Sequence, residues 1–274
     1  MDRFESKDIR VFDKFIEKFA SKYVDQRMMI KASELIQSPD CGFNTDLLSK
    51  VIQKNCVHYD EHREEGERPS VLNDIYRSDF GELLMTYYYE EKIENAEGRF
   101  IIPLKNISYR ERADMPGRGF DALGYRQKES GIINVLIGEA KVSSQRENPP
   151  AVVDKTNDSL YKSQKMHHDN TPMVLRILSD YVRRLSGKHL SALGCVVLSM
   201  EANHPEKYHM TYGCALVRDE TCVDTTKDFG KLQTNTDEFR PGDVNFIIFS
   251  LTEKTIDETV DLFYQKVQEI VNNE

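Results

Sequence analysis

The chain has 274 residues, of which 39% are hydrophobic and 30% charged, and its formal net charge is −9. This length and composition suit one large α/β domain, with or without a small helical addition. The sequence contains no apolar run of about eighteen residues, so a transmembrane helix is not expected. The first residues lack the apolar core of a signal peptide, and the 5 cysteines form no Cys-x-x-Cys pair. We therefore expect a reduced, cytoplasmic protein without a zinc site or a disulfide framework.

The net acidic charge limits how this chain can bind nucleic acid. Proteins that bind DNA on their own usually present a basic patch, because neutralising phosphates supplies most of the non-specific affinity. A chain with a net charge of −9 must either gather its basic residues around one site or receive DNA from another subunit.

Helical periodicity dominates the beginning of the chain. Residues 9–24 carry large apolar side chains at three- and four-residue steps, which predicts a helix. A second helix is expected over residues 45–57. The charged stretch 59–68 lacks such a period and is expected to be an exposed loop. We place a boundary there, between an N-terminal helical region (1–68) and a larger α/β domain (69–274).

Stretches with helical period alternate with short apolar runs in the larger domain. The order of helix, strands, helices, strands and helix predicts a central mixed sheet flanked by helices. Residues 127–131 are expected to form a hairpin turn, and 109–119 a loop rich in glycine and arginine. Helices are expected over 70–92, 151–166, 171–186 and 254–272, and strands over 100–104, 120–126, 132–141, 192–200, 209–218 and 244–251.

A hydrophobic run at 132–137 leads into Glu139-Ala140-Lys141. Because side chains alternate along a strand, Glu139 and Lys141 point to one face and Ala140 to the other. Asp121 stands on the preceding strand among apolar neighbours, where a carboxylate needs a partner or a metal. Glu82 lies on the helix expected over 70–92.

These residue types suit hydrolysis of a phosphodiester. Mg²⁺ prefers carboxylate and water oxygens, which Asp121 and Glu139 can supply, and the Ala140 carbonyl can complete the metal sphere. Glu82 can join as a further ligand or through a water molecule. Lys141 can orient the nucleophile or stabilise charge that develops on the phosphate. We expect Mg²⁺ as the cofactor, with Mn²⁺ able to substitute, and either one metal or two.

Each of these residues also has an ordinary structural interpretation. A Glu-x-Lys pair at a strand end is commonly a solvated ion pair, Asp121 can cap a turn beside Gly119, and Glu82 can be an exposed helix residue. Two features favour a joint site. The acid and Lys141 follow a run apolar enough to be a buried central strand, and Asp121 sits on the strand just before it.

Several basic and polar residues near Asp121 are candidates for contact with DNA phosphates. The alternative is a solvated loop in which the arginines pair with neighbouring acids. Gln145, after the strand, can orient water or phosphate, or belong to a plain loop. The arginines in question are Arg110, Arg112, Arg118 and Arg126.

The sequence His167-His168-Asp169 is a weaker candidate for a metal site. Adjacent histidines point to different sides of a helix, and no further ligands stand at the usual spacing. We therefore expect a solvated helix end.

Three ordered blocks resemble the PD-(D/E)XK nucleases, and within them the nuclease subunit of the Hachiman antiphage defence system. The resemblance implies a restriction-endonuclease-like fold from about residue 70 onward, with Glu82, Asp121, Glu139 and Lys141 as catalytic residues. One departure is Phe120, because the corresponding acid of the family is often preceded by proline. The blocks are Ser78–Leu84, Gly119–Gly124 and Ile137–Lys141.

The resemblance also implies a partner. The nuclease subunit works with a superfamily 2 DNA helicase, which senses DNA and restrains the nuclease, and release licenses broad DNA degradation in an infected cell. Two alternatives remain open: a non-catalytic nuclease-fold subunit that tethers or regulates a helicase, and a stand-alone restriction-like endonuclease.

Overall fold

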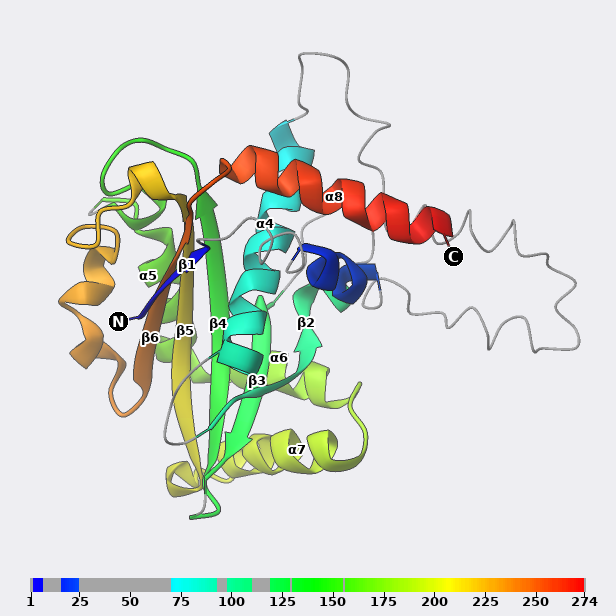
Figure 1. Ribbon diagram of the computed structural model, residues 1–274. Helices are drawn as coiled ribbons and strands as arrows, with labels where there is room; N and C mark the ends of the chain where they lie inside the picture. The colour runs from blue at the N-terminus through cyan, green and yellow to red at the C-terminus, as the bar shows by residue number, and fades with distance from the viewer. Residues whose placement is uncertain are drawn as a thin grey trace, which may run out of the picture.

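The computed structural model describes residues 2–6, 16–24, 70–92, 98–109, 119–128, 130–154 and 156–273. The strands in these ranges form a six-stranded sheet in the order β1-β6-β5-β4-β3-β2 (Figure 1). Their bounds are β1 Asp2–Ser6, β2 Ile101–Lys105, β3 Ala122–Gln127, β4 Ile133–Ser143, β5 Tyr208–Asp219 and β6 Asp243–Leu251.

The sheet is mixed. β2, β3 and β4 pair antiparallel, whereas β4, β5, β6 and β1 pair parallel. The expected hairpin joins β3 to β4, and in it the Lys128 N–H donates to the Ile132 carbonyl at 2.9 Å. Parallel strands need a crossover connection. The crossover from β4 to β5 is made by α5 (Ser159–Asp169), α6 (Thr171–Val182) and α7 (Gly187–Glu201).

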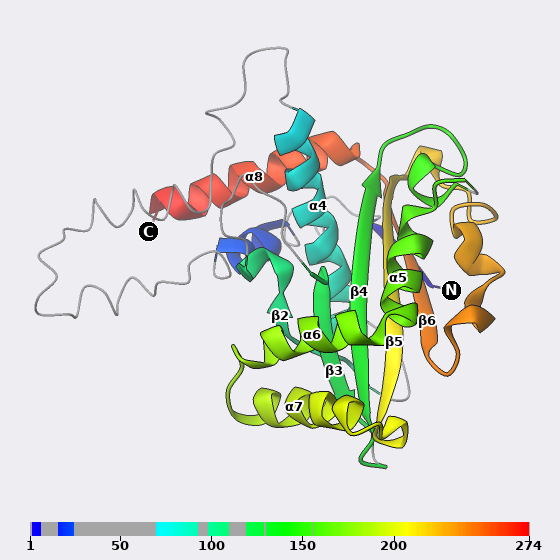
Figure 2. The same ribbon diagram turned by 180° about the vertical axis from the view of Figure 1, so that it is seen from behind.

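Helices cover both faces of the sheet. One layer contains α4 (Ser70–Tyr87), α8 (Ile256–Asn273) and the helical residues 16–24, and the opposite layer contains α5, α6 and α7 (Figure 2). Alternation along β4 serves both layers, because Leu136 packs in the core beneath α4 and Ile137 in the core beneath α5. The expected fold class, a mixed sheet flanked by helices, is confirmed.

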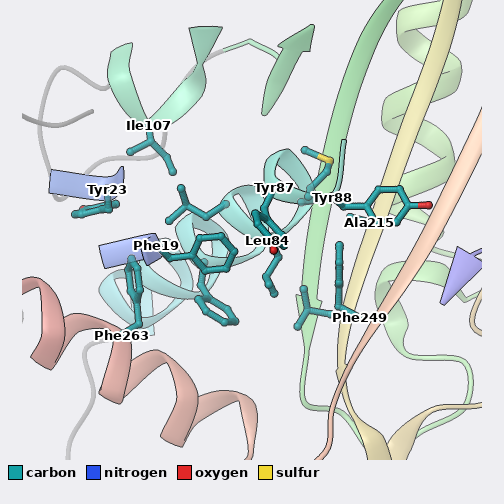
Figure 3. Packing of buried hydrophobic residues seen from close by; sticks show 14 of the residues in the cluster. Phe19, Tyr23, Leu84, Tyr87, Tyr88, Ile107, Ala215, Phe249 and Phe263 are labelled. Carbon is teal, nitrogen blue, oxygen red and sulfur yellow. The ribbon is translucent and has the colours of Figure 1, made fainter. Parts of the chain in front are cut away.

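The helical residues 16–24 belong to the same core as α4 (Figure 3). Phe19 meets Tyr87 of α4 edge to face, with ring centroids 5.3 Å apart. Tyr23 meets Phe263 of α8 in the same way at 5.6 Å. The boundary expected near residue 68, the helix expected over 45–57 and the loop 59–68 lie outside the described residues, so they stay predictions.

Two segments differ from the sequence expectations. Residues 192–200, expected as a strand, lie in the helix α7. Their apolar run is compatible with either structure, and the residues that face the core, Leu193 and Val196, are three apart as a helix requires. β1 was not expected, because five residues at one end carry little pattern until β6 pairs with them.

The ends of several expected helices also shift. The helix expected over 70–92 is α-helical to Tyr87 and continues as a π-helix over Tyr88–Lys92. The helix expected over 151–166 starts later, at Ser159, where the Asp158 carboxylate accepts from the Tyr161 N–H and so caps α5. Among the described helices, none has the length and apolar character that a membrane crossing requires.

Two glycines bring α4 unusually close to β4. A Cβ on Gly81 would stand 2.6 Å from Val142 Cγ2, and a Cβ on Gly138 would stand 2.8 Å from Met85 Cε. Neither space accommodates a side chain without a shift. The close approach matters because Gly81 precedes Glu82, one of the expected site residues.

We expect Gly81→Ala to lower the free energy of unfolding by about 1–2 kcal/mol, because overpacking at the α4–β4 contact outweighs the helix preference of alanine. Gly194→Ala is the matched control on α7, where the new Cβ would meet Val182 Cγ1 at 3.9 Å. The free energy of unfolding of this control should rise by up to about 1 kcal/mol. Urea unfolding measures both changes, and an equal gain in the two variants would contradict the close contact of α4 with β4.

Candidate active site

The candidate site forms where β4 extends beyond β3. The β3–β4 ladder ends at the pair Ala122 and Gly138, but β4 continues to Ser143 and stays paired with β5. Within the described residues, 139–143 therefore border a gap in the sheet on the side of β3. We call residues 139–143 the β4 extension.

Asp121 lies directly before β3 and closes part of this gap. The Ala140 N–H donates to Asp121 Oδ2 at 2.8 Å. A buried backbone N–H needs an acceptor, and here the carboxylate takes the place of a strand carbonyl. In an extended strand the N–H and C=O of one residue point to the same neighbour. The Ala140 carbonyl therefore faces the side on which Asp121 lies.

Glu139 and Lys141 share the face of the sheet that α5 covers. Lys141 Nζ lies 2.9 Å from Glu139 Oε1, and the two side chains are 30% and 10% exposed. Burial by itself lowers the pKa of Lys141, but the charges of Glu139, Asp121 and Glu82 outweigh it, and the pKa is raised. One ammonium thus lies within the electrostatic reach of three carboxylates.

Glu82 reaches this group from the opposite helical layer. It lies on α4 and is 2% exposed, and the Ser78 hydroxyl donates to its Oε1 at 3.4 Å. The close contact at Gly81 brings this turn of α4 against the β4 extension. The structure therefore brings together the four residues expected from the sequence: Glu82, Asp121, Glu139 and Lys141.

The donor set suits an open magnesium site better than a closed cage. In the ranges that the structure describes, no group of three or more His, Cys, Asp or Glu residues is arranged to hold a metal ion. Mg²⁺ usually keeps several waters and needs only one or two carboxylates together with substrate phosphate. Asp121 and Glu139 would supply two such carboxylates, and the Ala140 carbonyl faces the side on which Asp121 lies.

The loop after the β4 extension is fixed by hydrogen bonds. Gln145 Oε1 accepts from the Ala151 N–H at 2.7 Å, and the buried Arg218 donates to the Gln145 carbonyl at 2.8 Å. Arg77 of α4 donates to the Ser144 hydroxyl. The oxygen of the Gln145 side chain thus has a structural role, and its contact with DNA stays a prediction.

The arginines expected near the site fall into two groups. Arg126 is buried, lies over the Phe100 ring at 4.4 Å and donates to the Gly98 carbonyl at 2.9 Å. A phosphate contact would break these interactions, so Arg126 is a packing residue. Arg110, Arg112 and Arg118 lie outside the described residues.

His167 was expected at a solvated helix end, and this expectation is wrong. The residue is 5% exposed, and its ring meets Phe120 edge to face at 4.9 Å. Burial lowers the pKa of His167, while Glu139 acts to raise it and Lys141 to lower it. As expected for adjacent helix residues, His168 points elsewhere, toward the Arg240 carbonyl.

Phe120 explains the departure from proline noted above. The side chain is fully buried and lies between His167 and Tyr181 of α6, whose ring it stacks on at 6.1 Å. The sequence contained a signal for the burial of His167. The residues of α5 that face the core are spaced as one helical stripe: Leu160, Gln164 and His167.

Comparison with known proteins gives one match. The family model described as HamA matches residues 14–267, a span that includes every candidate site residue and both helical layers. No curated protein and no solved structure matches the chain.

The pKa of His167 has a consequence for stability. Because it lies below the ordinary value of about 6.5, the folded chain binds fewer protons there than the unfolded chain. The contribution of the neutral ring to the free energy of unfolding is complete above about pH 6.5 and is lost as the pH falls. In urea unfolding, wild type should therefore exceed His167→Asn in free energy of unfolding by less at about pH 5 than at about pH 7.5.

The exposed His204 supplies the control for this measurement. His204→Asn should stay within about 0.5 kcal/mol of wild type at both pH values. A difference in free energy of unfolding between wild type and His167→Asn that becomes larger in acid would contradict the buried, neutral ring.

Proposed function

Because this chain belongs to the HamA family of Hachiman antiphage defence subunits, we propose that it is a metal-dependent deoxyribonuclease. The observation that carries the proposal is the arrangement around Lys141 Nζ. Carboxylates from a helix, from the residue before a strand and from the β4 extension act on one ammonium at a gap in the sheet. The pKa of Lys141 is raised as a result, and groups with perturbed pKa values concentrate at functional sites.

In the proposed reaction a P–O bond forms to a water oxygen and the P–O bond to a sugar oxygen breaks. Lys141 stabilises the charge on the reacting oxygens, and Glu139 holds its ammonium at 2.9 Å. The Ala140 N–H keeps the Asp121 carboxylate turned toward the site. Bound Mg²⁺, or Mn²⁺ in its place, supplies charge neutralisation and water activation, with Asp121, Glu139 and the Ala140 carbonyl as ligands and Glu82 assisting.

The charge of the chain supports a partner that delivers the substrate. With 37 basic and 46 acidic residues, the overall field repels DNA. A superfamily 2 helicase subunit that binds DNA itself removes this obstacle. In the proposed complex the helicase restrains the nuclease, and once released the nuclease degrades DNA broadly.

The test of the site uses the chain co-purified with its helicase, with plasmid DNA, Mg²⁺ and ATP. We expect Glu139→Gln and Lys141→Met each to slow degradation by at least about 100-fold, a loss typical of removing one stabilising group. Their melting temperatures should stay close to that of wild type.

Lys227→Met is the matched control, because Lys227 is exposed and pairs with Asp224 rather than with a candidate site residue. It should degrade DNA as wild type does. Wild-type rates in both Glu139→Gln and Lys141→Met would refute the site, and an inactive wild-type complex would point to the non-catalytic subunit instead.

Metal binding is tested separately by titration calorimetry with Mg²⁺. Asp121→Asn keeps an oxygen that can accept from the Ala140 N–H but removes the negative charge, so we expect a weaker binding heat than in wild type. An equal heat in both proteins would remove Asp121 from the ligand set.

A gel shift of the isolated chain with DNA at low salt tests whether a partner is needed to bring the DNA. Tight DNA binding by the isolated chain would favour a stand-alone endonuclease.

A further inference from the structure

His167 borders the candidate site but has no part in the reaction outlined above. It lies on α5, over the same face of the sheet as Glu139 and Lys141. Among the described residues, these two carry the charges that act on its pKa. Its ring also packs against Phe120, which directly precedes Asp121. His167 is therefore a side chain of α5 that lies within the electrostatic reach of the site.

The hydrogen bonds of Gln164 determine which ring nitrogen carries hydrogen. Gln164 is fully buried, and its Nε2 donates to the Ile137 carbonyl at 3.2 Å and the Gly213 carbonyl at 2.8 Å. These two carbonyls fix the orientation of the amide and use both of its hydrogens. The Gln164 atom nearest His167 is then Oε1, which can only accept. His167 Nδ1 lies 3.5 Å from that oxygen. A hydrogen bond between these two atoms requires the hydrogen on Nδ1.

A neutral imidazole with hydrogen on Nδ1 has its lone pair on Nε2. His167 is 5% exposed, and burial disfavours the charged form of its ring. No described residue forms a hydrogen bond with Nε2. Within the described residues, Nε2 of His167 thus remains an available acceptor, on a ring that the charges of Glu139 and Lys141 reach.

We propose that His167 is a further catalytic residue, whose Nε2 accepts a hydrogen bond from the attacking water and turns the lone pair of that water toward phosphorus. This rests on the proposed nuclease function. The water oxygen bonds to phosphorus as the bond to the sugar oxygen breaks. One proton of the water passes to solvent and the leaving oxygen takes one from solvent, so His167 ends unchanged.

Two substitutions separate this role from a structural one. The amide nitrogen of His167→Asn stands near the position of Nδ1 and keeps the bond to Gln164, but no acceptor replaces Nε2. The amide oxygen of His167→Gln reaches the position of Nε2 and keeps an acceptor there, but the bond to Gln164 is lost. Both variants lose the ring contact with Phe120, so that loss cancels in the comparison.

We expect His167→Gln to retain DNA degradation within about tenfold of wild type, and His167→Asn to lose at least about a further tenfold, since a positioned acceptor contributes on this scale or more. Melting temperatures should show the opposite order, with His167→Asn the more stable of the two. Equal activities, or a more active His167→Asn, would overturn the proposal.

The tautomer is measured independently by nitrogen NMR on the complex with ¹⁵N-labelled histidine. The chain has 7 histidines, and the His167 signals are those that disappear in His167→Asn; if that variant does not fold, His167→Gln serves instead. Hydrogen on Nδ1 is expected, and hydrogen on Nε2 would overturn the proposal.

The activity assays separate a failure of this proposal from a failure of the proposed nuclease function. An inactive wild-type complex refutes the nuclease function itself. An active wild type with an inactive Glu139→Gln but equal His167 variants refutes only the role of His167.

Discussion

The site depends on one constraint: a buried β-strand cannot leave its backbone N–H groups without acceptors. β4 continues through residues 139–143 after its ladder with β3 has ended at Gly138. Ala140 sits in that extension, and Asp121 supplies the missing acceptor from a side chain. The same hydrogen bond that completes the strand therefore fixes a carboxylate beside Glu139 and Lys141. Stability of the sheet and placement of the acid thus depend on the same hydrogen bond.

The site also joins the two helical layers. Glu82 comes from the layer of α4 and α8, whereas Glu139 and Lys141 face the layer of α5. The three carboxylates of Glu82, Asp121 and Glu139 act on one ammonium, that of Lys141. The closely packed contact at Gly81 places the turn of α4 that carries Glu82 against β4. A partner that displaces α4 would separate Glu82 from the other three residues without touching a strand.

The sequence was informative where the physics is local. Alternation along the apolar run 132–137 predicted β4, and with it the common face of Glu139 and Lys141. Patterns that depend on distant contacts were missed. The run at 192–200 is equally apolar in a strand and a helix, and only packing on the sheet decides for α7. The burial of His167 depends on Phe120, a residue that the chain supplies from before β3.

The position of β1 constrains how the chain folds. Its residues 2–6 pair with residues 247–251 of β6, and β1 is the outer strand of the described sheet. Contacts between such distant segments form slowly, because the entropy of closing the intervening loop must be overcome first. On the ribosome, β1 is synthesised before β6 and cannot pair with it until β6 has emerged. The sheet therefore acquires this edge only after the segments that carry Glu82, Asp121 and Glu139 have emerged.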